Sequence, residues 1–140
     1  QNSQSHLEQK VLLAAANVTF KFVGTVSKQV KDAANRAKEF WGKYINTGKT
    51  LAVNVRENSR VNGNTLGWWQ PDGGGKDGLI QINSRANSGY AQLVDTTTHE
   101  FGHAFGLDHI KDTIMKAFGD SNSSVNQTLL NVLKRRGWRK

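Results

Sequence analysis

The sequence predicts an α+β domain whose first half is α/β-like. Three short apolar segments are candidate strands, at 18–22, 51–55 and 79–83, and the first of them alternates apolar and polar residues. Between the first two segments, apolar residues recur at helical spacing, which fits a right-handed crossover between strands of one sheet. A chain of 140 residues is long enough for one compact core but not for two, so we expect a single domain over residues 1–140.

The first strand and the helix after it have recognisable boundaries. Alternation places Val18, Phe20 and Phe22 on the buried face of the strand. Ser27 suits the N-cap of an amphipathic helix of about five turns that ends near Thr47-Gly48. Before the strand, residues 7–16 form a short helix or run directly into it. The apolar face of the amphipathic helix consists of Val30, Ala33, Ala34, Ala37, Phe40, Trp41, Tyr44 and Ile45.

The later elements are shorter or flanked by glycine. A polar loop at 58–64 precedes a short strand candidate at 66–70, and a glycine-rich loop follows at 71–78. In the last strand, Ile80 and Ile82 face the same way. A helix then begins near Ser88 to Tyr90. The final helix carries Val125, Leu129, Val132 and Leu133, with a cap among Ser121, Asn122 and Ser123 and an end near Gly137.

Composition excludes some classes of protein. No apolar run approaches the length of a membrane span, so we expect no membrane partner. The chain has no cysteine, and the fold therefore uses no disulfide. The net charge of +8 favours acidic partners or substrates. The last residues include a basic cluster, which consists of Lys134, Arg135, Arg136, Arg139 and Lys140. This cluster is either a solvated helix end that complements the helix dipole or a binding surface.

The strongest chemical signal is the run from His99 to His109. Residues four apart share one face of a helix, so His99 and His103 can bind the same metal ion. Glu100 lies beside them, where it could hold a water molecule at that ion. Gly106 can end the helix in the left-handed conformation and return His109 to the ion as a third ligand. Three imidazoles leave a fourth position open, which is typical of a catalytic zinc site.

The helical pattern around the motif supports the same site independently. At about 100° per residue, His99 and His103 lie opposite the middle of the apolar face. One side of the helix is therefore buried and the other presents the ligands. The alternative is a buried helix whose histidines are satisfied by hydrogen bonds. The predicted apolar face consists of Tyr90, Leu93, Val94, Thr97, Phe101, Ala104 and Phe105.

The full pattern, His99-Glu100-x-x-His103-x-x-Gly106-x-x-His109, resembles that of the metzincin metallopeptidases. Met115, the only methionine, follows six residues after His109, where a methionine turn is expected. The residues from Gly106 to His109 are most similar to the matrixin branch. The sequence departs from that branch at Ile110, where matrixins usually have serine, and Ala117 stands where astacins and serralysins have a tyrosine ligand.

The resemblance implies a metzincin fold and a reaction. The fold is a mixed, twisted sheet of four to five strands with an antiparallel edge strand, a backing helix, an active-site helix, a methionine turn and a C-terminal helix. The activity is that of a zinc endopeptidase in which Glu100 is the general base and acid for a zinc-activated water. Met115 forms an apolar floor under the metal and is not a ligand. The stretch 116–124 would form the wall of the specificity pocket.

The resemblance also implies where the substrate binds. A metzincin pairs its peptide substrate with an antiparallel edge strand just before the active-site helix, and here that strand is the segment Leu66, Gly67, Trp68 and Trp69. The alternative is that both tryptophans are ordinary core and surface residues on opposite faces of a strand.

The expected ions and partners follow from the same comparison. Matrixins hold a second, structural zinc through histidines, but no histidine lies between His6 and His99, so we expect one zinc only. Asp72 and Asp77 could supply oxygen ligands to calcium, or their loop could be a plain turn.

We expect a monomer that acts on protein or peptide substrates and does not bind nucleic acid. The chain begins at Gln1 and not at methionine, which is what removal of a signal or pro-segment leaves, or a fragment boundary. We expect a secreted protein. The alternative function is a catalytically silent binding protein that holds an acidic partner on its basic surface.

Overall fold

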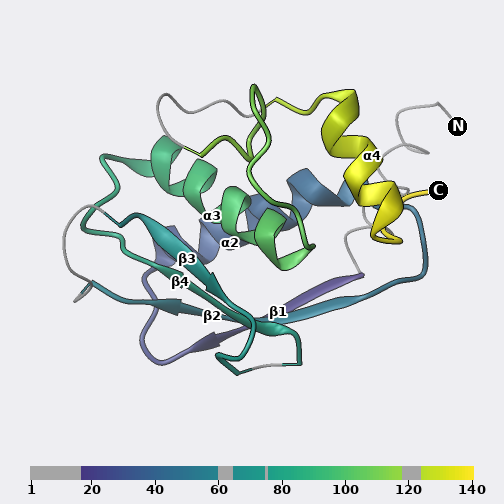
Figure 1. The fold of residues 1–140 in the computed structure, drawn as a ribbon. Helices are drawn as coiled ribbons and strands as arrows, with labels where there is room; N and C mark the ends of the chain where they lie inside the picture. The colour runs from purple at the N-terminus through teal and green to yellow at the C-terminus, as the bar shows by residue number, and fades with distance from the viewer. Residues whose placement is uncertain (1–16, 60–64, 75, 118–123) are drawn as a thin grey trace, which may run out of the picture.

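The sheet has four strands in the order β1-β2-β4-β3 (Figure 1). The computed structural model describes residues 17–59, 65–74, 76–117 and 124–140. Within them, β1 (Val18–Val23), β2 (Leu51–Glu57) and β4 (Gly78–Ile82) are parallel, whereas β3 (Gly67–Gln70) pairs antiparallel with β4 at the edge. The mixed sheet, its antiparallel edge and the crossover from β1 to β2 confirm the predicted α+β class.

Three helices complete the described part of the chain. They are α2 (Lys28–Gly42), α3 (Tyr90–Ala104) and α4 (Gln127–Arg135). Helices α2 and α3 pack against each other over one face of the sheet, and α4 lies beyond the end of α3 (Figure 1). None of these helices is long and apolar enough to cross a membrane. The expected helix at 7–16, most of the loop at 58–64 and most of the stretch at 116–124 lie outside the described residues.

Helix α2 is shorter than the sequence predicts. It begins after Ser27, whose side-chain oxygen accepts a hydrogen bond from the Val30 amide as expected. It ends at Gly42 and not near Thr47, because the Asn46 amide donates to the carbonyl of Trp138 at 3.0 Å and not to the preceding helical turn. Ile45 is still buried, so its helical spacing indicated the core correctly but not the backbone conformation.

Helix α4 begins later than expected. Its N-cap is Asn126, whose side chain accepts a hydrogen bond from the Leu129 amide, and not a residue among Ser121, Asn122 and Ser123. Val125 consequently lies before the helix. The predicted end is confirmed, because Gly137 has a positive φ of 85° and its amide returns to the carbonyl of Lys134.

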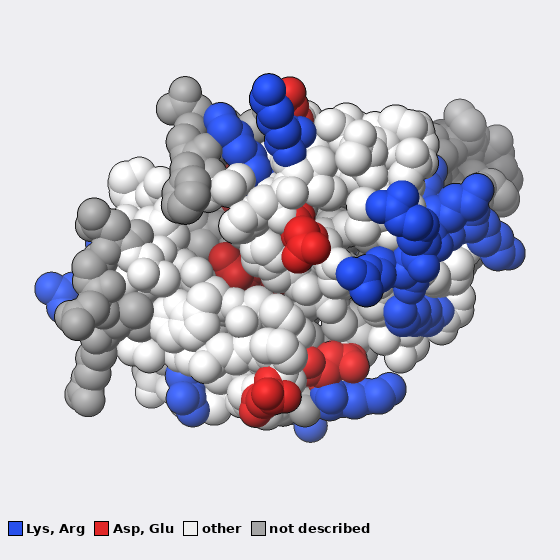
Figure 2. Space-filling view, viewed as in Figure 1, with Lys and Arg blue, Asp and Glu red and all other residues white. Residues whose placement is uncertain are grey.

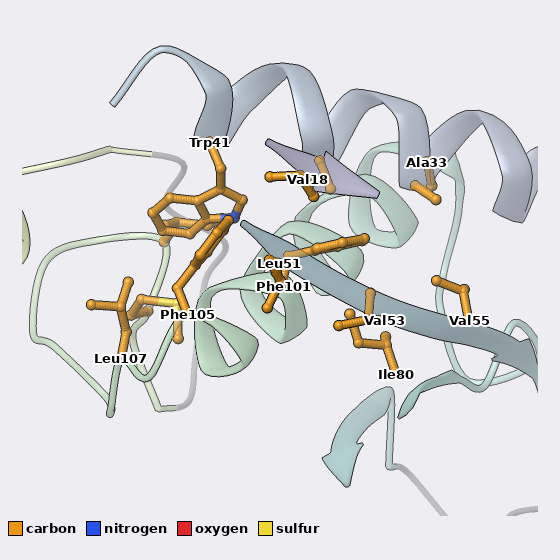
Figure 3. Packing of buried hydrophobic residues seen from close by; sticks show 14 of the residues in the cluster. Val18, Ala33, Trp41, Leu51, Val53, Val55, Ile80, Phe101, Phe105 and Leu107 are labelled. Atoms are coloured by element: carbon orange, nitrogen blue, oxygen red, sulfur yellow. The ribbon is translucent and has the colours of Figure 1, made fainter. Parts of the chain in front are cut away.

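The core lies between the sheet and the two packed helices, where Trp41 and Phe105 come together (Figure 3). Trp41 is fully buried, its ring centre lies 5.5 Å from that of Phe105, and its indole N–H donates to the carbonyl of Thr98. This contact fixes α2 against α3 with a directed hydrogen bond as well as apolar burial. Trp41 is therefore a core residue, as the sequence predicts.

Strand β4 is buried on both faces, not only on the face of Ile80 and Ile82. The loop before it covers Leu79, and a Cβ on Gly73 would lie only 2.6 Å from the Leu79 Cβ. Asp77 of this loop accepts a hydrogen bond from the amide of Ala52 in β2 at 2.8 Å. That carboxylate therefore ties the loop to the sheet. Asp72 is exposed, and a calcium ion at this loop stays a prediction.

A substitution at Gly102 tests the packing of α3 against Met115 and Trp41. A Cβ at this position would lie 2.2 Å from the Met115 sulfur and 2.9 Å from the Trp41 ring. We expect Gly102→Ala to lower the free energy of unfolding by about 1–3 kcal/mol, because both neighbours are buried and cannot move aside freely. Urea unfolding in the presence of a chelator measures this directly.

Gly48→Ala is the matched control, because a Cβ there meets nothing within 4 Å. We expect this variant to stay within about 0.5 kcal/mol of the wild type. Equal stability of the Gly102 variant and the wild type would show that the close packing of Met115 on α3 is wrong.

Candidate metal centre

Helix α3 presents its ligand-bearing side to a cleft and its other side to the core. Leu93, Thr97 and Phe101 are buried, whereas His99 and His103 are half-buried. The buried hydroxyls of Thr97 and Thr98 donate to the carbonyls four residues earlier, so they need no partner in the core. The predicted apolar face is wrong at Tyr90. This residue is the first of α3, and its side chain is 42% exposed.

The structure brings His99, His103 and His109 together in one group that could hold a metal ion. One ring nitrogen from each lies within 4.8 Å of the other two. The Nε2 atoms of His99 and His103 are 3.1 Å apart. Two ligands of a tetrahedral zinc with ordinary Zn–N bonds are about 3.3 Å apart, so this pair already has the required spacing. His109 is the exposed member of the group.

Backbone carbonyls orient two of the imidazoles. The Nδ1–H of His99 donates to the carbonyl of Ile114 at 2.7 Å, and that of His103 donates to the carbonyl of Leu107 at 2.8 Å. With the proton on Nδ1, both Nε2 atoms carry a free lone pair and face each other. This is the arrangement in which outer hydrogen bonds fix metal-binding histidines, so the donor set fits a cation.

A glycine turn returns the chain to the end of α3. Gly106 has a φ of 90°, in the left-handed region. Its amide donates to the carbonyl of His103, and the amide of Leu107 donates to that of Gly102. The predicted turn is confirmed, and it sets both the place of His109 and the direction of the Leu107 carbonyl.

A second turn packs against the end of α3. Met115 is fully buried against Gly102 of α3, and its carbonyl accepts a hydrogen bond from the Ile110 amide. Asp112, with a φ of 62°, takes the left-handed conformation at the bend. The turn therefore packs an apolar side chain against α3 and directs the Ile114 carbonyl at His99.

Burial keeps His99 and His103 uncharged. The pKa of His99 is lowered from 6.5 to about 4, mainly by desolvation and also by the neighbouring His103 and His109, against the raising effect of the Ile114 hydrogen bond. Burial also lowers the pKa of His103. Neutral imidazole is the form that binds metal, so at neutral pH protons do not compete for these two ligands.

Glu100 is a buried carboxyl group without a hydrogen-bond partner among the described residues. It is 6% exposed, and burial raises its pKa from 4.5 to about 7. Strand β3 packs against it, and a Cβ on Gly67 would lie 3.2 Å from the Glu100 Cγ. The carboxyl group therefore sits between the edge strand and the histidines, where its charged form is costly unless a cation is nearby.

One cleft of about 1010 Å³ joins the histidines, Glu100 and the edge strand. Leu66, Gly67, Trp68 and Trp69 line it together with the histidines, so the structure places the predicted substrate strand beside the predicted ligands. Trp69 also covers Gly78 of β4, where a Cβ would lie 2.5 Å from the indole ring. Trp69 therefore packs on the sheet as well as facing the cleft.

Sequence reasoning missed several contributors to this site. The carbonyls of Ile114 and Leu107 orient His99 and His103. Every residue has a backbone carbonyl, so the sequence does not show which carbonyls accept these hydrogen bonds. Arg136 lines the cleft from the other side, although it lies far along the chain. Only its membership of the basic cluster could have drawn attention to it.

Comparisons with known proteins do not identify the site. No family model, no curated protein and no solved structure matches the chain. Any function assigned to this site must therefore be argued from the three-histidine group and the residues around it.

The geometry predicts one metal ion per chain. We expect zinc titration to saturate at one equivalent, and His103→Ala or His109→Ala to weaken binding by at least about tenfold, because each removes one ligand. Competition with a chromophoric chelator measures the affinity. His6→Ala removes a histidine outside the group and should bind like the wild type. Equal affinity of all four proteins would contradict the site.

The buried carboxyl group of Glu100 should make the free energy of unfolding of the metal-free protein depend on pH. Below pH 4.5 Glu100 is protonated in both folded and unfolded chains, so it has no effect. Between pH 4.5 and 7 the unfolded chain ionises first, so stability is lost as the pH rises. We expect Glu100→Gln to be more stable than the wild type at pH 8, by up to about 3 kcal/mol, and equal to it near pH 4.

Urea unfolding with chelator at both pH values tests this. Glu39→Gln, which changes an exposed carboxyl group, should show no such gain. A Glu100 variant that is less stable than the wild type at pH 8 would show that the carboxylate is satisfied in the fold.

Proposed function

We propose that this protein is a zinc-dependent endopeptidase, a small matrixin-like member of the metzincins. The observation that carries the proposal is that three converging imidazoles, a buried glutamic acid and an antiparallel edge strand share one cleft. A structural metal site would be closed by four protein ligands, whereas this group offers three and opens onto the cleft. Met115 is buried against Gly102 of α3, in the turn whose Ile114 carbonyl binds His99, and this supports the same family.

Substrate binding would use the edge of the sheet. Strand β3 pairs with β4 on one side only, and its residues Gly67 to Trp69 line the cleft together with the preceding Leu66. An extended peptide could add a strand there through backbone hydrogen bonds, which hold the chain without demanding a particular side chain. The absence of a side chain on Gly67 leaves Thr96 and Glu100 close to this edge, so the bound backbone would pass near the carboxyl group.

Zinc, when bound, would supply Lewis acidity toward the scissile carbonyl and toward a water molecule. His99, His103 and His109 would hold it. Glu100 would take a proton from the attacking water onto its carboxylate and donate it to the leaving amine. In the metal-free site burial raises the pKa of Glu100, and a nearby cation acts in the opposite direction, favouring the carboxylate that can accept the proton.

The alternative is a catalytically silent protein that binds an acidic partner. The exposed basic cluster at the C-terminus is the observation that favours it. Glu100 argues for the enzyme, because burial raises the pKa of this carboxyl group in the cleft and a scaffold would have no need of it there. We further propose one zinc per chain, a monomer, protein or peptide substrates and a location outside the cell.

Glu100→Gln separates the two functions. We expect this variant to keep its zinc and to lose casein cleavage by about 100-fold or more, because the amide cannot accept the proton. Cleavage products and zinc content are measured on the same preparations. Glu39→Gln is the control and should cleave like the wild type, and a chelator should stop cleavage by both.

Cleavage by Glu100→Gln at the wild-type rate would contradict the role of the carboxylate. A zinc-loaded wild type that cleaves nothing would favour the binding protein.

A further inference from the structure

Arg136 connects the basic cluster with the cleft. It lines the cleft that contains His99, Glu100 and the edge strand, whereas Lys134, Arg135, Arg139 and Lys140 do not. Lys116 also lines the cleft, but it follows the methionine turn and does not belong to the cluster. Arg136 is therefore the one cation of the cluster that a molecule in the cleft could touch.

The position of Arg136 is fixed from several sides. It is the C-cap of α4, and its amide donates to the carbonyl of Val132 at 2.9 Å. Its own carbonyl accepts a hydrogen bond from the Lys49 ammonium at 2.7 Å. Its side chain lies against the turn that leads to His109, with Cδ and Nε 3.4 Å from where a Cβ on Gly106 would be. The guanidinium therefore lies next to the turn at Gly106 and lines the same cleft as the histidines.

The segment that follows is also firmly held. Trp138 is 3% exposed and its indole N–H donates to the carbonyl of Phe105. The Lys140 amide donates to the side-chain oxygen of Asn46, and Arg139 donates to the carbonyl of Tyr44. The basic cluster is consequently part of the packed fold, and a ligand would meet an already ordered surface.

No carboxylate neutralises this surface among the described residues, where none of its cations forms an ion pair. Figure 2 shows the basic side chains gathered over α4 and the C-terminal end of the chain. The carboxyl groups that line the cleft, Asp95, Glu100 and Asp108, come from α3 and the turn after it. The cleft therefore has acidic groups along α3 and an unpaired cation where α4 meets it.

We propose that Arg136 is a specificity-determining residue that binds an aspartate or glutamate side chain of the peptide substrate. This inference rests on the proposed peptidase function. The guanidinium presents parallel donors that match a carboxylate, and the surrounding positive charge draws such a peptide toward this end of the cleft. Since Arg136 is exposed, solvent and salt reduce the gain, so the expected preference is several-fold and not absolute.

The test begins with a mixture of proteome-derived peptides. Cleavage sites of the wild type are identified by mass spectrometry, and an excess of Asp and Glu at one fixed distance from the cut is expected. The best site is then made as a pair of amidated decapeptides that differ only by Glu or Gln at that position. The ratio of their kcat/KM values is measured for the wild type, Arg136→Gln and Arg135→Gln. Arg135→Gln is a matched control, because it removes one charge from the neighbouring exposed residue, which does not line the cleft.

We expect the wild type and Arg135→Gln to prefer the Glu peptide by about fivefold, and Arg136→Gln to show a ratio near one. The same pattern should appear in the Kd values of the two peptides for proteins that also carry Glu100→Gln, which measures binding without cleavage. Zinc content and urea unfolding are compared for all variants.

Cleavage without an acidic preference, or an equal loss in both arginine variants, would overturn the inference and leave the peptidase intact. Loss of zinc in Arg136→Gln would also overturn it, since Arg136 would then support the His109 turn. Tight binding of a DNA or RNA oligonucleotide that both arginine variants weaken equally would reassign the surface to a different partner. Absence of any cleavage by the zinc-loaded wild type would overturn the proposed function, and this inference with it.

Discussion

The contact between the turn at 112–115 and the end of α3 holds the candidate site together. Met115 packs on Gly102 with no space for a side chain between them, and the same turn directs the Ile114 carbonyl at His99. One element thus supplies apolar support and the hydrogen bond that orients a ligand. Because Trp41 packs on the same glycine and binds the Thr98 carbonyl, the core behind α3 also fixes the spacing of the histidines. A loss of packing here would disturb the ligands before it disturbed the sheet.

In the metal-free protein, burial acts on two of the histidines and on the carboxyl group of the site and disfavours their charged forms. Burial keeps His99 and His103 neutral and also disfavours the charged form of Glu100. A bound cation would suit both kinds of group, because neutral imidazoles could bind it and a nearby carboxylate would be stabilised by it. Burial raises the pKa of Glu100 beside the histidines, and a carboxyl group perturbed in this way in a cleft is more often part of a functional site than of a purely structural one.

The sequence predicted the parts of this structure that depend on residue type and spacing. The i, i+4 histidines, the left-handed glycine at 106 and the strand–helix crossover each follow from local rules, and the structure agrees. Features that depend on distant partners could not be predicted. Helix α2 ends early because Asn46 bonds to Trp138, the two histidines are oriented by backbone carbonyls, and Arg136 reaches the cleft only because the C-terminal segment packs on Phe105.

We propose that His99, His103 and His109 together bind one zinc ion and leave its fourth position open. X-ray absorption at the zinc edge of the loaded protein tests this most directly. We expect three imidazole nitrogens at about 2.0–2.1 Å and one further light atom, with one imidazole fewer in His109→Ala. A zinc ion surrounded by six oxygens, or by the same number of imidazoles in both proteins, would contradict it.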